Sequence, residues 1–203
     1  DSGGSGIDHC PDSSPTNPTA ACELGADGQA RVGSVVIDLP SVRASGGPAL
    51  DLVRGEAVDV DIAVLSADDF HPAVVLDMIE GAVDLPDVTT SGPSVVASSP
   101  AAVTVGQLTS PDAGGLQVVD GAGTVAVATL ASTTTGTALE VVDQQPTGQV
   151  VVGTLDATGG SDAVAVRGGV GTIHVSRASV TDPAGAALRV EARGGTVRID
   201  DGT

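Results

Sequence analysis

Residues 163–185 read AVAVRGGVGTIHVSRASVTDPAG, and this stretch holds one complete period of a repeat. A short aliphatic strand with Val164 and Val166 leads into a Gly-rich loop. A second strand with Ile173 and Val175 follows, and after it come a third apolar position and a polar loop. Apolar side chains at i and i+2 have the period of a β-strand and not the 3.6-residue period of a helix. The stretch therefore predicts short strands separated by corners.

The same order of strand, loop, strand and loop recurs about every 20–25 residues along the chain. The pairs of the first series are Val35/Ile37, Val58/Val60, Val83/Leu85, Val103/Val105, Val125/Val127, Val150/Val152, Ile173/Val175 and Val197/Ile199. The pairs of the second, offset series are Leu50/Leu52, Val74/Leu76, Val95/Ala97, Leu116/Val118, Leu139/Val141, Val164/Val166 and Leu188/Val190. Two series that advance in step predict a solenoid in which each residue stacks on its equivalent in the next circuit.

We therefore expect an all-β fold, a parallel β-solenoid with three short strands per circuit, over residues 30–203, with the first circuit opening at Ala30. Residues 1–29 lack the period and are expected to form a polar leader or cap. About eight circuits spaced by ~4.8 Å would rise roughly 40 Å. The expected third apolar column consists of Leu39, Val88, Leu108, Leu130, Leu155 and Ala178.

The composition fits a narrow interior that is the same at every level. Val, Ala and Leu supply the apolar residues, and Phe70 is the single aromatic side chain. The chain has no lysine, and its formal net charge is −18. Such a charge repels nucleic acid and anionic lipid surfaces, so we expect neither as a partner.

The two cysteines, Cys10 and Cys22, flank a Pro-, Ser- and Thr-rich segment that has little apolar surface to bury. We expect a disulfide between them, which implies an oxidising compartment, secreted or at the cell surface. The alternative is a pair of free thiols in a flexible leader. No segment reaches the ~18 consecutive apolar residues that a membrane-spanning helix needs, so membrane insertion is not expected.

Residues 163–185, and similarly 138–160 and 187–203, resemble single circuits of the right-handed parallel β-helix family typified by pectate lyases. The resemblance covers about 170 of the 203 residues and implies a right-handed solenoid. Many members of that family stack asparagines at a corner, whereas the one asparagine here, Asn17, lies outside the repeat. We expect small residues, Ser and Thr to occupy the corners instead.

The pectate-lyase resemblance also implies a possible calcium site, because these lyases use Asp and Glu ligands beside a basic residue. The repeat places Asp59 and Asp84 in one outward column, with Asp61 and Asp87 close by. Stacked carboxylates repel one another, and a hard cation such as Ca²⁺ would relieve that repulsion. Arg54 is then the nearest base. The alternative is a surface of solvated carboxylates without a ligand.

Two further groups of polar residues invite a functional interpretation. Near the C-terminus the repeat stacks His174 on Arg198, Arg167 on Glu191 and Arg177 on Asp201, and we interpret the last two as ion pairs between circuits. An anionic-sugar site on this basic patch is the alternative. The corner formed by Asp68, Asp69, Phe70, His71 and Pro72 lacks the further ligands of a zinc site, so we expect a polar corner with Phe70 tucked inward.

The function expected from these patterns is that of a non-catalytic structural or adhesive module, a stalk, spacer or assembly subunit at the cell surface. The expected partners are other protein modules or a polysaccharide, with end-to-end or homo-oligomeric assembly through an uncovered last circuit. The alternative is a calcium-dependent carbohydrate-active enzyme, or a carbohydrate-binding remnant, of the pectate-lyase type. The absence of Trp and Tyr as platforms for sugar rings, together with short loops, argues against the enzyme.

Overall fold

The computed structural model describes residues 22–24, 30–32, 35–56, 58–68, 70–99, 101–133, 135–191 and 193–203. Every regular element within these residues is a β-strand, as expected for the all-β class. Strands β1 (Cys22–Leu24) and β2 (Ala30–Val32) pair antiparallel and form a small separate sheet. The solenoid therefore starts with strand β3 at Val35 and not at Ala30.

The remaining strands form two parallel sheets. The larger sheet contains β3 (Val35–Leu39), β4 (Val42–Ala44), β6 (Val58–Ile62), β7 (Val64–Ala67), β9 (Gly81–Thr90), β11 (Ala102–Ser110), β13 (Thr124–Ser132), β15 (Gln149–Thr158), β17 (Thr172–Thr181) and β19 (Thr196–Gly202). The smaller sheet contains β5 (Leu50–Val53), β8 (Val74–Asp77), β10 (Ser94–Ala97), β12 (Leu116–Val119), β14 (Leu139–Val142), β16 (Val164–Arg167) and β18 (Leu188–Glu191).

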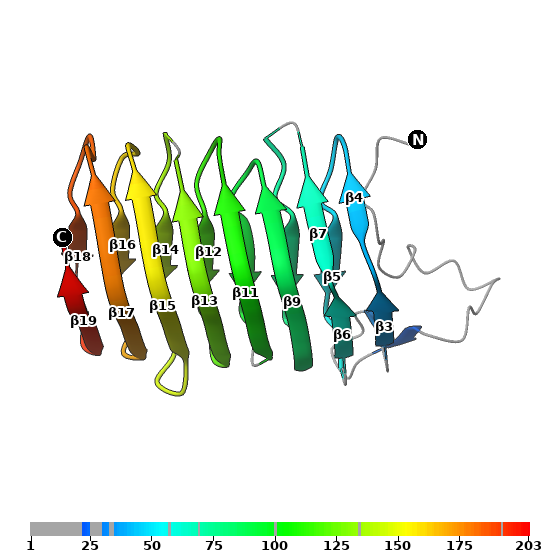
Figure 1. Ribbon diagram of the computed structural model, residues 1–203. Coiled ribbons are helices and arrows are strands. Elements are labelled where there is room, and N and C mark those ends of the chain that lie inside the picture. Colours follow the sequence, from blue (N-terminus) through cyan, green and yellow to red (C-terminus); the bar gives the residue numbers. More distant parts are fainter. Residues whose placement is uncertain are drawn as a thin grey trace.

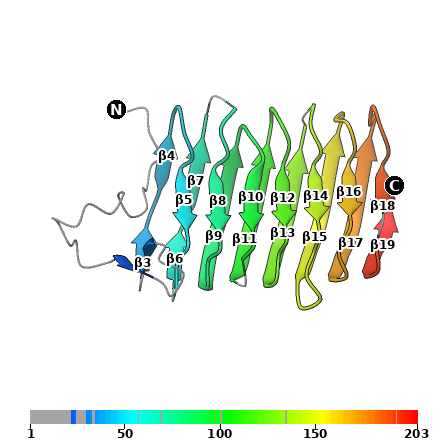
Figure 2. The ribbon, with the colours of Figure 1, turned by 180° about the vertical axis from the view of Figure 1, so that it is seen from behind.

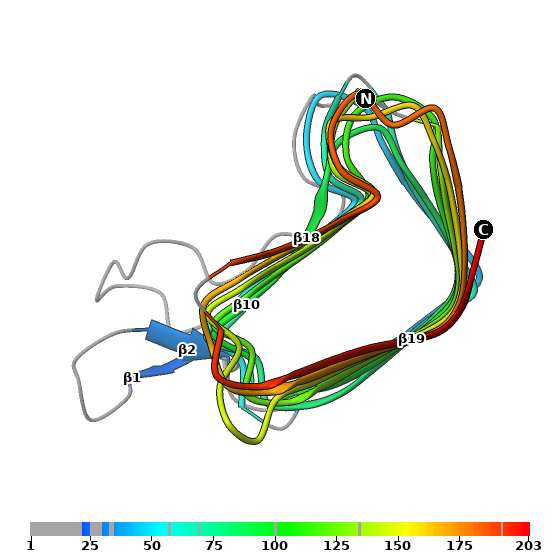
Figure 3. The ribbon, with the colours of Figure 1, turned by 90° about the vertical axis from the view of Figure 1, so that its left-hand side faces the viewer.

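The two sheets are the walls of one right-handed solenoid (Figures 1 and 2). Viewed from the C-terminal end, the chain runs anticlockwise as it approaches the viewer (Figure 3). We call one circuit a coil; the described residues complete seven coils and begin an eighth with β19. At ~4.8 Å per level, the stack from β3 to β19 rises about 34 Å.

The core lies between the sheets and repeats at each level. Val127 pairs with Val152 and Val152 with Val175, and all three side chains are buried. The predicted aliphatic column is therefore confirmed. From the third coil onward one long bent strand replaces the two short strands of the first two coils (Figure 3), so that each coil still has three faces.

The predicted register is confirmed between the first and second coils, where Val35 pairs with Val58 and Ile37 with Val60, and it is wrong between the second and third coils. Val58 pairs with Gly81 and Val60 with Val83, two residues away from the expected alignment of Val58 with Val83. Three apolar residues alternate in β6: Val58, Val60 and Ile62. Moving the pairing of β6 with β9 by two residues leaves every inward side chain pointing into the core, so both registers bury the apolar residues equally well. Leu39 continues the first strand and pairs with Ile62, so it does not belong to the third column, in which Val42 and Leu65 pair instead.

In the third coil the expected faces of β10 are reversed. Ser94 and Val96 point into the core and pair with Leu116 and Val118, whereas Val95 faces outward beside Gln117. The segment Ser-Val-Val-Ala has no alternation that separates the two possibilities, and a slip of one residue exchanges the faces. The buried Ser94 hydroxyl has no hydrogen-bond partner among the described residues.

Buried hydroxyls occupy one corner, as expected in place of an asparagine stack. Ser110 stacks on Ser132, and the side chains of Thr90, Ser110 and Ser132 are buried at the ends of the long strands. The Thr90 hydroxyl accepts a hydrogen bond from the Ala73 amide at 2.9 Å, and Ser110 donates to the Gly114 carbonyl. The first bond ties the end of β9 to the return loop of the preceding coil, and the second ties a return loop to the strand before it.

Candidate functional site

Three aspartates form a column on the outer face of the larger sheet. Asp38 pairs with Asp61 and Asp61 with Asp84, and all three side chains are exposed. The stacking of Asp59 on Asp84 is wrong, because Asp59 lies between Val36 and Ala82 after the shift of register. Carboxylates are thus stacked in three successive coils, which is electrostatically unfavourable. The sequence predicted such a stack, but with Asp59 in place of Asp61.

The other residues assigned to the calcium site do not join this column. Asp87 lies on the next face of the solenoid, where it pairs with Val64 and Gln107. Arg54 follows β5 of the smaller sheet and does not lie on the sheet that carries the aspartates. Within the described residues no group of three or more His, Cys, Asp or Glu is placed to hold a metal ion. Calcium binding stays a prediction without geometric support.

An ion-pair network covers the smaller sheet near the C-terminal end, where the sequence predicted stacked charges. Arg167 lies 2.7 Å from Glu140 and 3.8 Å from Glu191, and the alignment of Arg167 with Glu191 is confirmed. Arg189 lies 3.5 Å from Glu191 and 2.8 Å from Asp162. Charges of opposite sign therefore alternate across three coils.

Asp162 is the most enclosed member of this network. Its carboxylate accepts hydrogen bonds from Arg189 and from the Ala186 amide, the latter at 2.7 Å. These donors, Arg189 first and the Ala186 amide second, hold the pKa of Asp162 below its usual range against the opposing effect of burial. The arrangement fastens the loop that precedes β18 to the coil below it.

A second set of ion pairs lies on the larger sheet at the same end. His174 stacks on Arg198, as expected, and both side chains contact Asp200, with 2.9 Å from His174 Nε2 to Asp200 Oδ2. The hydrogen bond from His174 and then that from Arg198 lower the pKa of Asp200. The predicted pair between Arg177 and Asp201 is confirmed at 3.8 Å. The contacts of His174 and Arg177 bind one coil to the next, and among the described residues His174, Arg177 and Arg198 each face a carboxylate.

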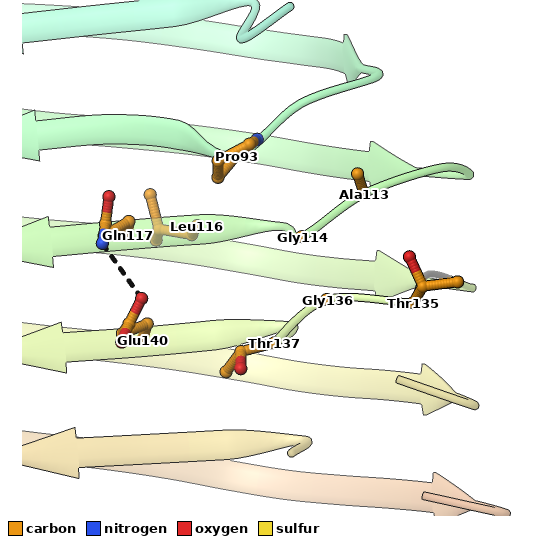
Figure 4. Close-up of a pocket in the computed structure, with 9 residues that line it drawn as sticks. All are labelled: Pro93, Ala113, Gly114, Leu116, Gln117, Thr135, Gly136, Thr137 and Glu140. Atoms are coloured by element: carbon orange, nitrogen blue, oxygen red, sulfur yellow. Dashed lines mark hydrogen bonds between the residues drawn. The ribbon is translucent and has the colours of Figure 1, made fainter. Parts of the chain in front are cut away.

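A shallow groove of about 270 Å³ crosses the return loops of coils three to five, where each loop meets the smaller sheet (Figure 4). The outline of the solenoid bends inward at the start of this sheet (Figure 3). The lining residues are Pro93, Ala113, Gly114, Leu116, Gln117, Thr135, Gly136, Thr137 and Glu140. A Cβ on Gly136 would lie 2.6 Å from the Gly114 amide nitrogen, so the close approach of these loops requires glycine.

The polar groups of the groove come from the sheet and from the loops. Gln117 Nε2 donates to Glu140 Oε2 at 3.0 Å (Figure 4). Arg167 donates to the other oxygen of Glu140 at 2.7 Å. Both oxygens of Glu140 are thus engaged, which suits binding better than proton transfer. Thr135 and Thr137 add hydroxyls at the opposite side. The Gly and Pro breakers of the loops were the only sequence signal of this groove.

The corner at residues 68–72 differs from the prediction. Phe70 does not pack inward; its side chain is 73% exposed and its backbone has φ of +62°. The backbone of His71 binds Asp68, with 3.3 Å between the amide nitrogen and the carbonyl oxygen. Asp69 lies outside the described residues.

The predicted disulfide also falls outside the described part of the chain, because Cys10 is not included in it. The Cys10–Cys22 bond therefore stays a prediction. None of the residues that the structure covers forms a helix with the length and hydrophobicity to cross a bilayer.

Comparisons with protein-family profiles, with curated proteins and with solved structures give no match. The parallel β-solenoid is therefore established by the strand pairing of this chain itself.

Proposed function

We propose that this chain is a non-catalytic structural β-solenoid, a stalk, spacer or assembly subunit that acts outside the cell or on its surface. The observation that carries the proposal is the uninterrupted parallel pairing of one strand per coil from β3 to β19. Such a stack transmits position along its axis, because each level is bonded to its neighbours by a ladder of backbone hydrogen bonds.

The short connections and the engaged ionisable groups support this role. Enzymes place their catalytic groups in clefts, with acids and bases free to exchange protons. Here Glu140 in the groove is bonded through both oxygens, and Asp162 is held by Arg189. The placement of the module outside the cell depends on the predicted disulfide and on the acidic, lysine-free composition.

Removal of one whole coil tests the role of the rod. Thr124 pairs with Gln149, so deletion of residues 124–148 joins equivalent positions and removes β13 and β14. A spacer tolerates this change: the variant keeps its β-sheet circular dichroism, and X-ray scattering shows a rod shorter by about 4.8 Å. A chain that unfolds without this coil is not built from interchangeable levels, and that outcome contradicts the proposal.

A second candidate is polysaccharide binding at the groove, and the alternation of amide, carboxylate and hydroxyl groups along it favours this candidate. Gln117 and Glu140 offer a donor and an acceptor on the sheet, and Thr137 offers a hydroxyl on the loop side. The aspartate column lies on the other sheet, so the two do not form one calcium-dependent site. The resemblance to pectate lyases therefore supports binding more than turnover.

Glycan binding and turnover separate the two candidates. Pectin- and alginate-like oligosaccharides are titrated against the wild type, Gln117→Ala and Val95→Ala, since Val95 has the same outward position one coil earlier but does not line the groove. Binding lost only in Gln117→Ala favours the second candidate. Depolymerisation in the presence of calcium that disappears in Asp84→Ala overturns the non-catalytic proposal. If the chain shows no glycan binding and no depolymerisation, the result supports a purely structural role.

A further inference from the structure

The outer face of the smaller sheet carries a strip of four valines. Val75 stacks on Val95, and Val119 stacks on Val142. All four side chains point away from the core and are half-buried. They come from β8, β10, β12 and β14, so this valine strip crosses four successive coils in the middle of the solenoid (Figure 2). Contiguous apolar residues on an outer face mark interaction sites, whereas scattered ones do not.

No described element covers the valine strip. The smaller sheet lies open on its outer side, and the return loops stand beside its first residues, where the outline of the solenoid bends inward (Figures 2 and 3). The backbones of β10 and β12 are already paired with the strands on both sides. An additional strand therefore finds no free edge here. An α-helix satisfies its own backbone hydrogen bonds and needs only an apolar surface to lie on.

Carboxylates flank the valine strip on the side opposite the return loops. Asp77 ends β8, and Asp120 and Asp143 directly follow β12 and β14. Among the described residues none of these three carboxylates belongs to an ion pair. Asp120 accepts a hydrogen bond from the uncharged Gln145 side chain, which leaves its charge uncompensated. This flank therefore favours a partner with basic side chains and repels one with acidic side chains.

The chain itself does not supply such a partner. Residues 1–29 contain no arginine, and the whole chain contains no lysine. A second copy brings a net charge of −18 to the same acidic surface, so its approach is unfavourable. A polysaccharide would leave hydroxyl groups without hydrogen-bond partners against four valines. The apolar strip and its acidic flank together fit a basic amphipathic element of another protein.

We infer that the valine strip binds a basic amphipathic α-helix of another protein. The apolar face of the helix lies on the valines, and its arginines or lysines point toward Asp77, Asp120 and Asp143. From β8 to β14 the strip spans three steps of ~4.8 Å, about 14 Å in all, which corresponds to nearly three helical turns. Apolar residues spaced by three or four along the helix therefore meet successive coils. This inference goes beyond the structural role proposed above and does not depend on it.

Synthetic peptides of about 18 residues, long enough to form a helix, test the site on the whole chain. The probe consists of leucine and arginine, with the leucines at helical spacing. One control is a scrambled peptide of the same composition, and the other has glutamate in place of arginine. Fluorescence anisotropy at physiological salt should show the probe binding at least tenfold more tightly than both controls, and circular dichroism should show it becoming helical. Equal binding of the scrambled peptide, or no binding of the probe up to ~200 µM, overturns the inference.

A matched pair of variants assigns the binding to the valine strip. Val119→Lys places a positive charge within the strip, and Val151→Lys places the same charge on a half-buried, outward valine of the larger sheet. We expect Val119→Lys to weaken binding of the probe at least tenfold and Val151→Lys to leave it unchanged, with circular dichroism confirming that both variants fold. Equal effects of the two substitutions contradict the assignment. If Val119→Lys does not fold, Val142→Ser replaces it.

Two other results would assign this face to a different occupant. A dimer of the chain alone that light scattering detects and that Val119→Lys disrupts identifies a second copy. Binding of an oligosaccharide that is lost in Val119→Lys identifies a glycan. Either result overturns the inference of a helical partner.

Discussion

Asp162 and Arg189 form a two-point ion pair that joins the sixth coil to the seventh. Arg189 Nε lies 2.8 Å from Oδ2 of the carboxylate, and Nη2 lies 3.1 Å from Oδ1. The Ala186 amide binds the same carboxylate, so a side chain of one coil holds both the loop and the strand of the next. Bidentate pairs with an additional amide donor are stronger than single-point surface pairs.

Asp162→Asn is expected to lower the melting temperature of the chain. The amide keeps one acceptor but loses the charge that attracts Arg189, and we expect a decrease of about 2–4 °C at pH 7. Asp182→Asn is the control, because Asp182 is exposed in the corresponding loop of the next coil. Equal decreases in both variants contradict a specific role for the Asp162 pair.

The contribution of Asp162 depends on pH in a defined direction. Its folded-state pKa is lowered, so the stabilisation is complete above the unfolded pKa and is lost as the pH falls through the folded value. The melting temperatures of wild type and Asp162→Asn should therefore differ above the unfolded pKa of about 4 and converge as the pH falls below it. A difference that persists at low pH shows that packing, and not charge, is responsible.

Asp61→Asn is expected to stabilise the fold, because Asp61 lies between Asp38 and Asp84 in the carboxylate column. Like charges on adjacent strands are unfavourable, and we expect a gain of about 0.5 kcal/mol in the free energy of unfolding at low salt. Asp59→Asn is the matched control with no stacked carboxylate. Denaturation in urea at two salt concentrations measures the difference, which should shrink in high salt.

Calcium provides a second measurement on the same pair of variants. If the column of Asp38, Asp61 and Asp84 binds the ion, calcium raises the melting temperature of wild type and of Asp59→Asn but not that of Asp61→Asn. An increase that is the same in all three proteins indicates general screening of the acidic surface.

Gln144→Met is expected to stabilise the chain. Gln144 is fully buried at the corner after β14, and neither amide atom has a hydrogen-bond partner among the described residues. Glycines leave the space for it, since a Cβ on Gly148 would lie 2.4 Å from Nε2. Replacing a buried, unpaired amide with an apolar group of similar size should gain about 1 kcal/mol.

Gln149→Met is the control for this substitution, because Gln149 is exposed and should tolerate the change without effect. Chemical denaturation of both variants measures the difference. A loss of stability in Gln144→Met would mean that a buried water satisfies the amide.

Met78→Gly is expected to stabilise the fold and Met78→Val to destabilise it. Met78 has φ of +54°. It is one of six residues that directly follow a strand of the smaller sheet and have left-handed backbone: Arg54, Met78, Ser98, Asp120, Asp143 and Gly168. A left-handed residue costs roughly 1–2 kcal/mol unless it is glycine, and a β-branched side chain suffers most. Urea denaturation should order the stabilities as Gly, then Met, then Val, and a reversed order contradicts this origin.

The sequence predicted the late coils better than the early ones. From β11 onward each short apolar pair is bounded by breakers, so the alignment has one solution, and the columns through Val127 and Leu130 are found as expected. In the first coils longer alternations permit a shift of two residues, and in β10 the missing alternation permits a shift of one. The aspartate column therefore contains Asp61 where Asp59 was expected, although a stack of carboxylates was predicted there.

The groove depended on contacts that no local pattern encodes. Loops from three coils form the groove, and its depth depends on how closely Gly114 and Gly136 approach. The ion pair between Asp162 and Arg189 joins a loop to a strand that the repeat does not align. The period-2 repeat by itself determined the parallel solenoid, because only stacked coils bury every apolar column at once. Only the tertiary structure decided which partner each polar side chain contacts. Long side chains reach residues of the neighbouring coils, and the repeat pattern does not distinguish one coil from another.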